Sequence, residues 1–229
     1  MSIKSPGLFI AFEGGDGAGK STQAARLSDA LESRGLSVLR TREPGGTPIG
    51  EKLRSLVLDH GHGIIDPRTE ALMFAAARAA HASQVIRPAL SDGTVVITDR
   101  YIDSSVAYQG AGRGLGAEGV LSLNEWATEG LHPDLTVLLD VEPSDGRQRR
   151  TVGDATEDRL ESEPDDFHSA IRHAFLDLAA AAPSSYLVLP ASADIETLAG
   201  RILERVESLL LSHGAAASPQ GETVSGERS

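Results

Sequence analysis

The sequence predicts an α/β domain in which a five-stranded parallel sheet carries helices on both faces. Five short apolar runs have the length and composition of buried parallel strands; they cover residues 8–13, 37–42, 94–98, 135–141 and 186–190. Segments with helical spacing separate these runs. Because alternating strands and helices favour a parallel sheet with helices on its two faces, we expect this architecture.

Helical spacing marks the segments between the strands. They cover residues 20–33, 48–58, 67–90, 117–129, 165–182 and 194–211. The third segment is long and rich in alanine, and it places Leu72, Ala76, Ala79 and Ala80 on one face. In the fourth segment Trp126 lies on an apolar helical face, so we expect it to belong to the core.

The length of 229 residues suits one α/β domain, which we expect to cover residues 1–211. Residues 146–164 form a polar, charged stretch inside this domain, and we expect a short mobile lid there. Residues 212–229 are rich in Ala, Gly, Ser, Pro and Glu. That composition buries little apolar surface, so we expect a disordered tail.

Composition excludes several classes of function. The chain has 33 acidic and 21 basic residues, and its formal charge of −12 argues against a nucleic-acid polymer as partner. It has no cysteine, which excludes disulfides, thiolate metal sites and cysteine nucleophiles. We see no signal peptide and no apolar stretch as long as a membrane span. We therefore expect a soluble, cytoplasmic protein without a membrane partner.

A phosphate-binding loop follows the first predicted strand. Residues 14–21 read Gly-Gly-Asp-Gly-Ala-Gly-Lys-Ser, which fits G-x-x-x-x-G-K-S, and a predicted helix comes directly after them. The glycines let the backbone turn its N–H groups toward a phosphate, and the helix N-terminus adds a positive dipole. Lys20 reaches the outer phosphates and the Ser21 hydroxyl joins a Mg²⁺ shell. A glycine-rich turn with a chance Lys-Ser pair is much less plausible, so we expect a P-loop NTPase.

Charged residues follow the next two strands. Arg42 and Glu43 leave the second strand, and Asp99 and Arg100 end the third. In parallel sheets the carboxyl ends of strands face the ligand crevice, where Asp99 could hold Mg²⁺ through water and Arg100 could clamp a second phosphate. The alternatives are an ordinary strand-to-helix loop in the first case and a solvated charge pair in the second.

The long alanine-rich helix carries a ring and a cation on one face. Phe74 and Arg78 are four residues apart, so together they could hold a flat base by stacking and by edge hydrogen bonds. Residues 104–114 add hydroxyls and an amide that could contact a base or a sugar. The alternative is that Phe74 is a core residue and Arg78 a surface cation.

Together these segments resemble the thymidylate kinase family. The resemblance rests on residues 12–23, 42–47, 72–78, 99–109 and 158–161, the last of which reads Asp-Arg-Leu-Glu. The five segments occur in the order of the family and extend over about residues 8–211. The resemblance implies ATP- and Mg²⁺-dependent phosphorylation of dTMP to dTDP, which supplies dTTP for DNA synthesis, and a homodimer.

The resemblance also implies roles for individual residues. ATP would be bound by Gly14, Gly15, Asp16, Gly17, Ala18, Gly19, Lys20, Ser21 and Thr22. dTMP would be bound by Asp16, Arg42, Phe74, Arg78, Arg100, Ser105, Tyr108 and Gln109. Within that set, Phe74 would stack on thymine, Arg78 would hydrogen-bond its O4, and Tyr108 would pack beneath the sugar. Mg²⁺ would be held at Ser21, Asp16 and Asp99. The catalytic set would be Lys20, Arg100, Arg150, Arg149 and Glu43.

The source of the catalytic arginine distinguishes types within the family. Some members carry an arginine inside the phosphate loop, whereas Gly17 and Ala18 stand at the corresponding place here. The predicted lid has Arg147, Arg149 and Arg150 instead. The chain therefore looks like the bacterial type that supplies this group from the lid, and we favour Arg150, then Arg149.

Three other functions remain as alternatives. The first is a kinase of the same class for another nucleotide. The second is a GTPase-like switch, but the sequence has no Asn-Lys-x-Asp guanine-reading motif. The third is a non-catalytic nucleotide-binding module, which the intact Lys20, Ser21 and Asp99 argue against.

Overall fold

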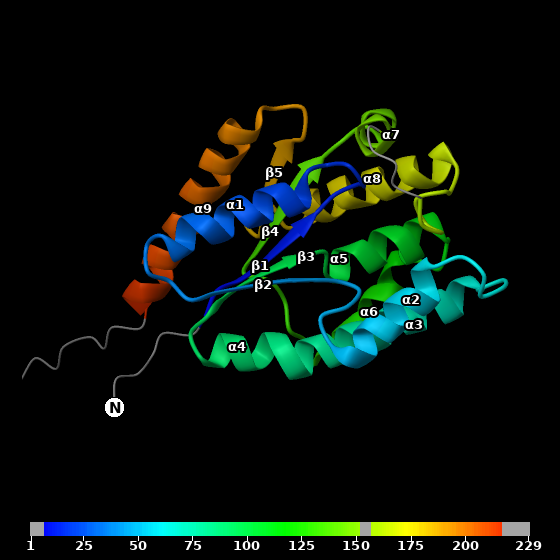
Figure 1. Ribbon diagram of the computed structural model, residues 1–229, viewed down its shortest axis with the longest axis horizontal. Helices are drawn as coiled ribbons and strands as arrows, with labels where there is room; N and C mark the ends of the chain where they lie inside the picture. Colours follow the sequence, from blue (N-terminus) through cyan, green and yellow to red (C-terminus); the bar gives the residue numbers. More distant parts are fainter. Residues whose placement is uncertain (1–6, 152–156, 217–229) are drawn as a thin grey trace, which may run out of the picture.

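The computed structural model describes residues 7–151 and 157–216. Its five strands form one parallel sheet in the order β2-β3-β1-β4-β5 (Figure 1). The strands are β1 (Phe9–Glu13), β2 (Val38–Arg42), β3 (Val95–Asp99), β4 (Leu135–Asp140) and β5 (Tyr186–Pro190). The predicted fold class is confirmed, and each strand boundary lies within one residue of the prediction.

Helices connect the strands. They are α1 (Lys20–Glu32), α2 (Pro48–Leu58), α3 (Pro67–His81), α4 (Arg87–Ser91), α5 (Ile102–Ser105), α6 (Ala117–Thr128), α7 (Pro143–Thr151), α8 (Asp165–Ala181) and α9 (Ile195–Ala216), with two π-helical segments, η1 (Ala82–Ile86) and η2 (Val106–Gly112). The helix predicted over 67–90 is interrupted by η1, directly before a turn that contains Pro88. Because proline has no N–H and its ring crowds the carbonyl four residues earlier, a widened turn accommodates it.

The two faces of the sheet are covered by different helices. Ile10 and Phe12 of β1 belong to an apolar cluster with α1 and α9, which lie together on one side of the sheet in Figure 1. Phe9 and Ala11, which point the other way, pack with side chains from η1, α5 and η2. This alternation follows from the two-residue period of a strand. It fixes β1 as the buried centre of the domain.

The register of the central strands brings three loops to one edge of the sheet. Asp99 lies beside Phe12 of β1 and beside Arg42 of β2. Beyond the strands, the Arg100 N–H donates to the Phe12 carbonyl at 2.9 Å, and the Glu43 N–H donates to the Asp99 carbonyl at 2.9 Å. The phosphate loop and the two charged strand ends therefore meet at the carboxyl edge, where such sheets bind ligands.

The expectation that Trp126 is a core residue is wrong: its side chain is 81% exposed. The buried stripe of α6 consists instead of Val120, Asn124 and Thr128, which follow one another at intervals of four. Asn124 accepts a hydrogen bond from the buried Arg78. The need to satisfy a buried guanidinium therefore turns the polar side of α6 inward and the tryptophan outward.

Two predicted segments extend beyond the described residues. Helix α9 continues to Ala216, past the predicted end of the domain at 211, and residues 217–229 of the expected tail lie outside the described part of the chain. In the predicted lid, α7 covers the first residues, while residues 152–156 are outside the description. Within the described ranges, no helix has both the length and the apolar character needed to cross a membrane.

Candidate active site

The phosphate loop lies between β1 and α1, and its glycines are required by close backbone approaches. Gly14 has a φ of 131°, and a Cβ there would lie 2.3 Å from the Leu139 carbonyl oxygen. Gly19 has a φ of 93° and directly precedes α1. Both conformations are ones that residues with a side chain rarely adopt. The loop is thus shaped by backbone geometry that only glycine allows.

Lys20 is held inside the loop. Its ammonium group donates to the carbonyl oxygens of Gly14 at 3.0 Å and Gly15 at 2.9 Å. Burial lowers the pKa of Lys20, and the positive charge of Arg100 lowers it further. An anionic phosphate group beside Lys20 would oppose both effects. The ammonium group of Lys20 therefore lies where an ion pair with a phosphate would stabilise its charged form.

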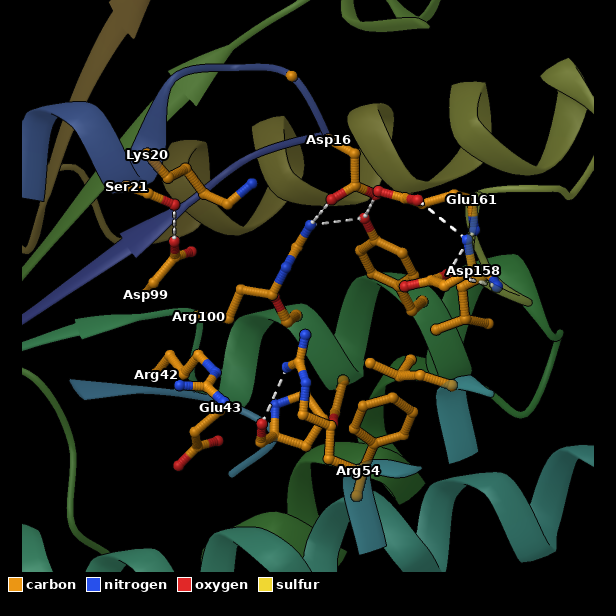
Figure 2. A pocket seen from close by; sticks show the side chains of 18 of the residues that line it. Asp16, Lys20, Ser21, Arg42, Glu43, Arg54, Asp99, Arg100, Asp158 and Glu161 are labelled. Carbon is orange, nitrogen blue, oxygen red and sulfur yellow. Dashed lines mark hydrogen bonds and ion pairs between the residues drawn. The ribbon is translucent and has the colours of Figure 1, made fainter. Parts of the chain in front are cut away.

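The side-chain oxygens of Ser21 and Asp99 lie together beside the phosphate loop. The Ser21 hydroxyl donates to the Asp99 carboxylate at 2.6 Å, although the two residues are 78 positions apart (Figure 2). Mg²⁺ prefers oxygen ligands, and proteins usually offer it one or two side chains while phosphates and water complete its shell. A hydroxyl and a carboxylate beside a phosphate loop fit that requirement.

Arg100 points across the cleft toward the phosphate loop. It donates to the Asp16 carboxylate and, at 3.0 Å, to the Tyr108 hydroxyl, and it stacks 4.9 Å above the Tyr108 ring (Figure 2). Burial is the largest single effect on Arg100 and by itself would lower its pKa. The interactions with Asp16, Tyr108, Glu13 and Asp99 together outweigh burial and raise the pKa well above its ordinary value. Arg100 is thus a permanent cation beside the loop.

A buried carboxylate fixes the backbone around Arg100. Arg100 has a φ of 71°, which is rare for a residue with a side chain. Glu13 accepts hydrogen bonds from the N–H groups of Tyr101 at 2.8 Å and Ser104 at 3.2 Å, and from the Ser104 hydroxyl at 2.6 Å. Burial, together with the charge of Asp103, raises the pKa of Glu13 to about 7. Sequence reasoning missed this residue because it ends an otherwise apolar strand.

Arg78 is fully buried, so the alternative that it is a surface cation is wrong. Its Nε donates to Glu43 at 2.5 Å, and the rest of its guanidinium donates to the Ser105 hydroxyl at 2.8 Å, the Tyr101 carbonyl at 3.0 Å and Asn124. The other Glu43 oxygen lies 2.9 Å from Nδ1 of the buried His81. Glu43 and Arg78 thus form a buried ion pair at the wall of the cleft.

These groups meet in one cleft of about 510 Å³. Sixteen of the predicted site residues line it: Asp16, Gly17, Gly19, Lys20, Ser21, Thr22, Arg42, Glu43, Phe74, Arg78, Asp99, Arg100, Ser105, Tyr108, Gln109 and Arg149. Gly14, Gly15 and Ala18 belong to the loop but do not line this cleft. The cleft therefore joins the predicted ATP and dTMP sites.

Arg54 is a lining residue that sequence reasoning missed. It lies on α2, points toward the Arg42 side of the cleft in Figure 2, and donates to the Pro44 carbonyl at 3.0 Å. Burial lowers the pKa of Arg54, and the charge of Arg42 adds to this effect. The available signal was an arginine about two turns into the helix after the Arg42–Glu43 loop. Three arginines, Arg42, Arg54 and Arg100, thus line the cleft, where Arg42 pairs with Glu51 at 3.0 Å and Arg100 with Asp16.

The start of the predicted lid packs directly on the phosphate loop. A Cβ on Gly17 would lie 2.3 Å from the Gly146 carbonyl oxygen, and one on Gly146 would lie 2.4 Å from that of Asp16. Further along α7, Arg149 lines the cleft and donates to the Ala191 carbonyl at 3.0 Å. The side chain of Arg150, which the sequence favoured, lies outside the described part of the structure.

The fold and the cleft are those of a P-loop nucleotide kinase: a glycine-rich loop with the Ser21–Asp99 pair lies at one end, and arginines and an aromatic ring line the rest. The family model for thymidylate kinase matches residues 12–202. The chain belongs to the thymidylate kinase family.

Curated relatives agree with this assignment. The thymidylate kinase of Leifsonia xyli subsp. xyli (strain CTCB07) is 54% identical over 209 residues, which cover 90% of this chain and 99% of the relative. That of Clavibacter sepedonicus is 52% identical over 211 residues, covering 92% and 99%. That of Cutibacterium acnes is 50% identical over 204 residues, covering 89% and 98%. The similarity thus extends over nearly the full length of each relative.

Proposed function

We propose that this chain transfers the γ-phosphoryl group of ATP to dTMP and releases dTDP and ADP. The observation that carries the proposal is a single cleft that holds Lys20 and the Ser21–Asp99 pair at one end and Phe74 and Arg78 at the other. Membership of the thymidylate kinase family supports the choice of substrates. We also propose that the protein is located in the cytoplasm.

The phosphate loop and Lys20 would bind the ATP phosphates. The Ser21 hydroxyl and the Asp99 carboxylate would hold Mg²⁺, and Asp16 lies close enough to the same region to contribute. When bound, Mg²⁺ neutralises phosphate charge and fixes the position of the transferring group. Lys20 would give up its contacts with the Gly14 and Gly15 carbonyls in favour of phosphate oxygens.

The opposite end of the cleft would bind dTMP. Arg100, with Arg42 and Arg54 nearby, would hold its phosphate, because guanidinium groups match phosphate oxygens in charge and geometry. Phe74 would stack on the thymine ring, while Arg78, Ser105 and Gln109 would contact its edge. The ring of Tyr108, fixed by Asp16 and Arg100, would pack beneath the sugar.

The transfer would depend on position and charge. The attacking group is an oxygen of the dTMP phosphate, which is already anionic, so the step needs no strong general base. Arg100 and Lys20 would neutralise the charge that accumulates where two phosphates approach. When the lid closes, it would exclude water from the cleft and bring a lid arginine, Arg149 or Arg150, close to the transferring group.

We also propose that the chain forms a homodimer. Leu72 on α3 and Trp126 on α6 are large apolar side chains that are mostly exposed. A second copy of the chain would cover such surface and remove it from water. Light scattering coupled to size exclusion tests this: a mass of about twice 24.0 kDa supports the dimer, and a mass of one chain contradicts it.

Measuring ADP production with ATP and Mg²⁺ tests the function. The acceptors dTMP, dUMP, dCMP, dGMP and AMP are offered in parallel with a sample that has none. We expect turnover to favour dTMP strongly, with little hydrolysis in its absence. Turnover with another monophosphate would indicate a different nucleotide kinase. Hydrolysis that ignores every acceptor would fit a GTPase-like protein, and an absence of turnover would fit a non-catalytic module.

A further inference from the structure

Glu70 is a buried carboxylate near the start of α3 to which no role has been assigned above. Its side chain is fully inaccessible to solvent. It accepts hydrogen bonds from Arg159 at 2.6 Å, from Arg113 at 3.2 Å and from the side-chain amide of Gln109 at 2.9 Å. Glu70 thus connects the base of the predicted lid with a residue that lines the cleft.

The two arginines account for a charge at this buried position. Arg113 also pairs with Glu163 at 2.6 Å, so two guanidinium groups and two carboxylates balance one another. A buried carboxylate is stable when it is paired and fully hydrogen-bonded in this way. An ionised carboxylate can only accept hydrogen bonds. Glu70 therefore imposes the direction of every hydrogen bond that it makes.

That direction fixes the amide of Gln109. Because Glu70 only accepts, Gln109 must turn its NH₂ group toward Glu70 and its carbonyl oxygen away from it. Gln109 lines the cleft beside Arg78 and Ser105, and its side-chain oxygen makes no hydrogen bond with the described residues. The free polar atom that Gln109 offers at the base end of the cleft is thus an acceptor.

We propose that Glu70 is a positioning residue that sets the base preference of the kinase through Gln109. The inference rests on the function proposed above. An acceptor at this place matches a pyrimidine that carries a hydrogen on N3, as thymine and uracil do. The same acceptor would repel cytosine, because N3 of cytosine is itself a hydrogen-bond acceptor. Without Glu70, the amide of Gln109 could turn over and offer its NH₂ group instead.

The test compares dTMP with 5-methyl-dCMP, which keeps the methyl group but reverses the polarity of N3 and of the C4 substituent. In Glu70→Gln the residue at position 70 no longer imposes one amide orientation on Gln109. We expect the ratio of kcat/KM for dTMP over 5-methyl-dCMP to fall about tenfold, the order of magnitude of one matched hydrogen bond. A folded Glu70→Gln protein that keeps the wild-type ratio within twofold would overturn the inference.

Two further variants separate orientation from general damage. Arg113→Met removes a cation from Glu70 but leaves the Glu70–Gln109 contact, so kcat or stability should fall while the base ratio stays within twofold. In a Gln109→Met background, Glu70→Gln should no longer change the ratio, because the group it orients is absent. An equal loss of base preference in both backgrounds would show that Glu70 acts by another route.

A measurement on the unmodified protein covers the case in which Glu70→Gln does not fold. The side-chain NH₂ signals of Gln109, identified by their loss in Gln109→Met, should exchange slowly with solvent both without and with dTMP. Rapid exchange in the free protein would contradict the contact with Glu70. A wild-type protein that fails to phosphorylate dTMP would instead refute the proposed function. The two failures are therefore distinguishable.

Discussion

The hydroxyl of Ser21 donates a 2.6 Å hydrogen bond to the carboxylate of Asp99, and this contact joins the first turn of α1 to the end of β3. The parallel register places the two residues together, since β1 and β3 are neighbours and both end at the same edge. The phosphate loop and the Asp99 carboxylate thus lie at the ends of adjacent strands.

We predict that weakening the Ser21–Asp99 pair raises the Mg²⁺ concentration needed for activity. Ser21→Ala removes the hydroxyl, and Asp99→Asn replaces the carboxylate by a neutral amide. For each variant we expect kcat/KM at limiting Mg²⁺ to fall by about 10- to 100-fold. Activity is measured across a Mg²⁺ titration. Ser33→Ala, which removes an exposed hydroxyl beyond the end of α1, is the control. Titration curves that superimpose on the wild type would contradict the assignment.

We predict that the lid supplies the catalytic arginine from Arg149 or Arg150. Replacing both by alanine should lower kcat on the order of 10³-fold, by analogy with other arginines that neutralise a transferring phosphoryl group. The single variants identify which one acts. Arg147→Ala is the control, because Arg147 pairs with Asp165 at 3.0 Å, and it should stay within a few-fold of the wild type. Near-normal turnover of the double variant would exclude both residues.

We predict that Arg78 is required for stability as well as for base contact. Arg78→Met leaves the buried Glu43 carboxylate without its 2.5 Å partner, and such losses cost about 3–5 kcal/mol. For a chain of this size, Tm should fall on the order of 10 °C. Arg26→Met breaks an exposed pair with Glu196 and should cost less than about 1 kcal/mol. Equal losses in the two variants would show that burial of the pair is unimportant.

Sequence patterns predicted the strands because a buried parallel strand has a simple apolar signature. The phosphate loop could be predicted for a similar reason, because the spacing of its glycines before Lys20 and Ser21 is typical of one backbone conformation. The position of Trp126 could not, since α6 presents Asn124 rather than its tryptophan to the interior. That choice depends on a partner, Arg78, which lies 46 positions away. Contacts between distant polar residues leave no local pattern in a sequence.

We predict a distinctive pH dependence from Glu13. Its pKa is raised from about 4.5 to about 7, so between these values the folded protein binds more protons at this site than the unfolded chain. The stability that Glu13 contributes is present below pH 4.5, falls as the pH rises and is lost above pH 7. The change is on the order of 3 kcal/mol.

Urea unfolding of the wild type and of Glu13→Gln at pH 5, 6 and 7.5 isolates the contribution of Glu13 together with its interaction with Asp103, because groups that do not interact with Glu13 cancel in the difference. The substituted side chain carries no charge at any of these pH values, so the variant should gain stability relative to the wild type as the pH rises. A difference between the two proteins that does not change over this range would show that Glu13 titrates normally.

We predict that the close packing of α7 on the phosphate loop tolerates no side chain. Gly146→Ala places a Cβ 2.4 Å from the Asp16 carbonyl oxygen, so either the loop or the helix must move. We expect a loss of about 1–3 kcal/mol and a higher KM for ATP. Gly119→Ala on α6, where a Cβ meets nothing within 4 Å, should be neutral or stabilising by about 0.5–1 kcal/mol. Equal effects would contradict the contact.

The residues in and around the cleft differ in the same way: those that belong to sequence motifs could be predicted, and those that only tertiary contacts place there could not. Lys20, Phe74 and Arg100 could be predicted because they belong to segments with a recognisable order. Arg54 and Glu70 could not, since each is one of several charged residues on its helix and nothing in the local sequence distinguishes it from the others. Their roles depend on the direction in which the helix faces the cleft, and tertiary packing decides that direction.

We propose that this cleft transfers a phosphoryl group between two nucleotides. Incubating the protein with γ-³²P-labelled ATP, Mg²⁺ and dTMP, and separating the products, tests it most directly. We expect label in dTDP, in an amount equal to the ADP formed. Label that appears only as inorganic phosphate, with dTMP unchanged, would contradict it.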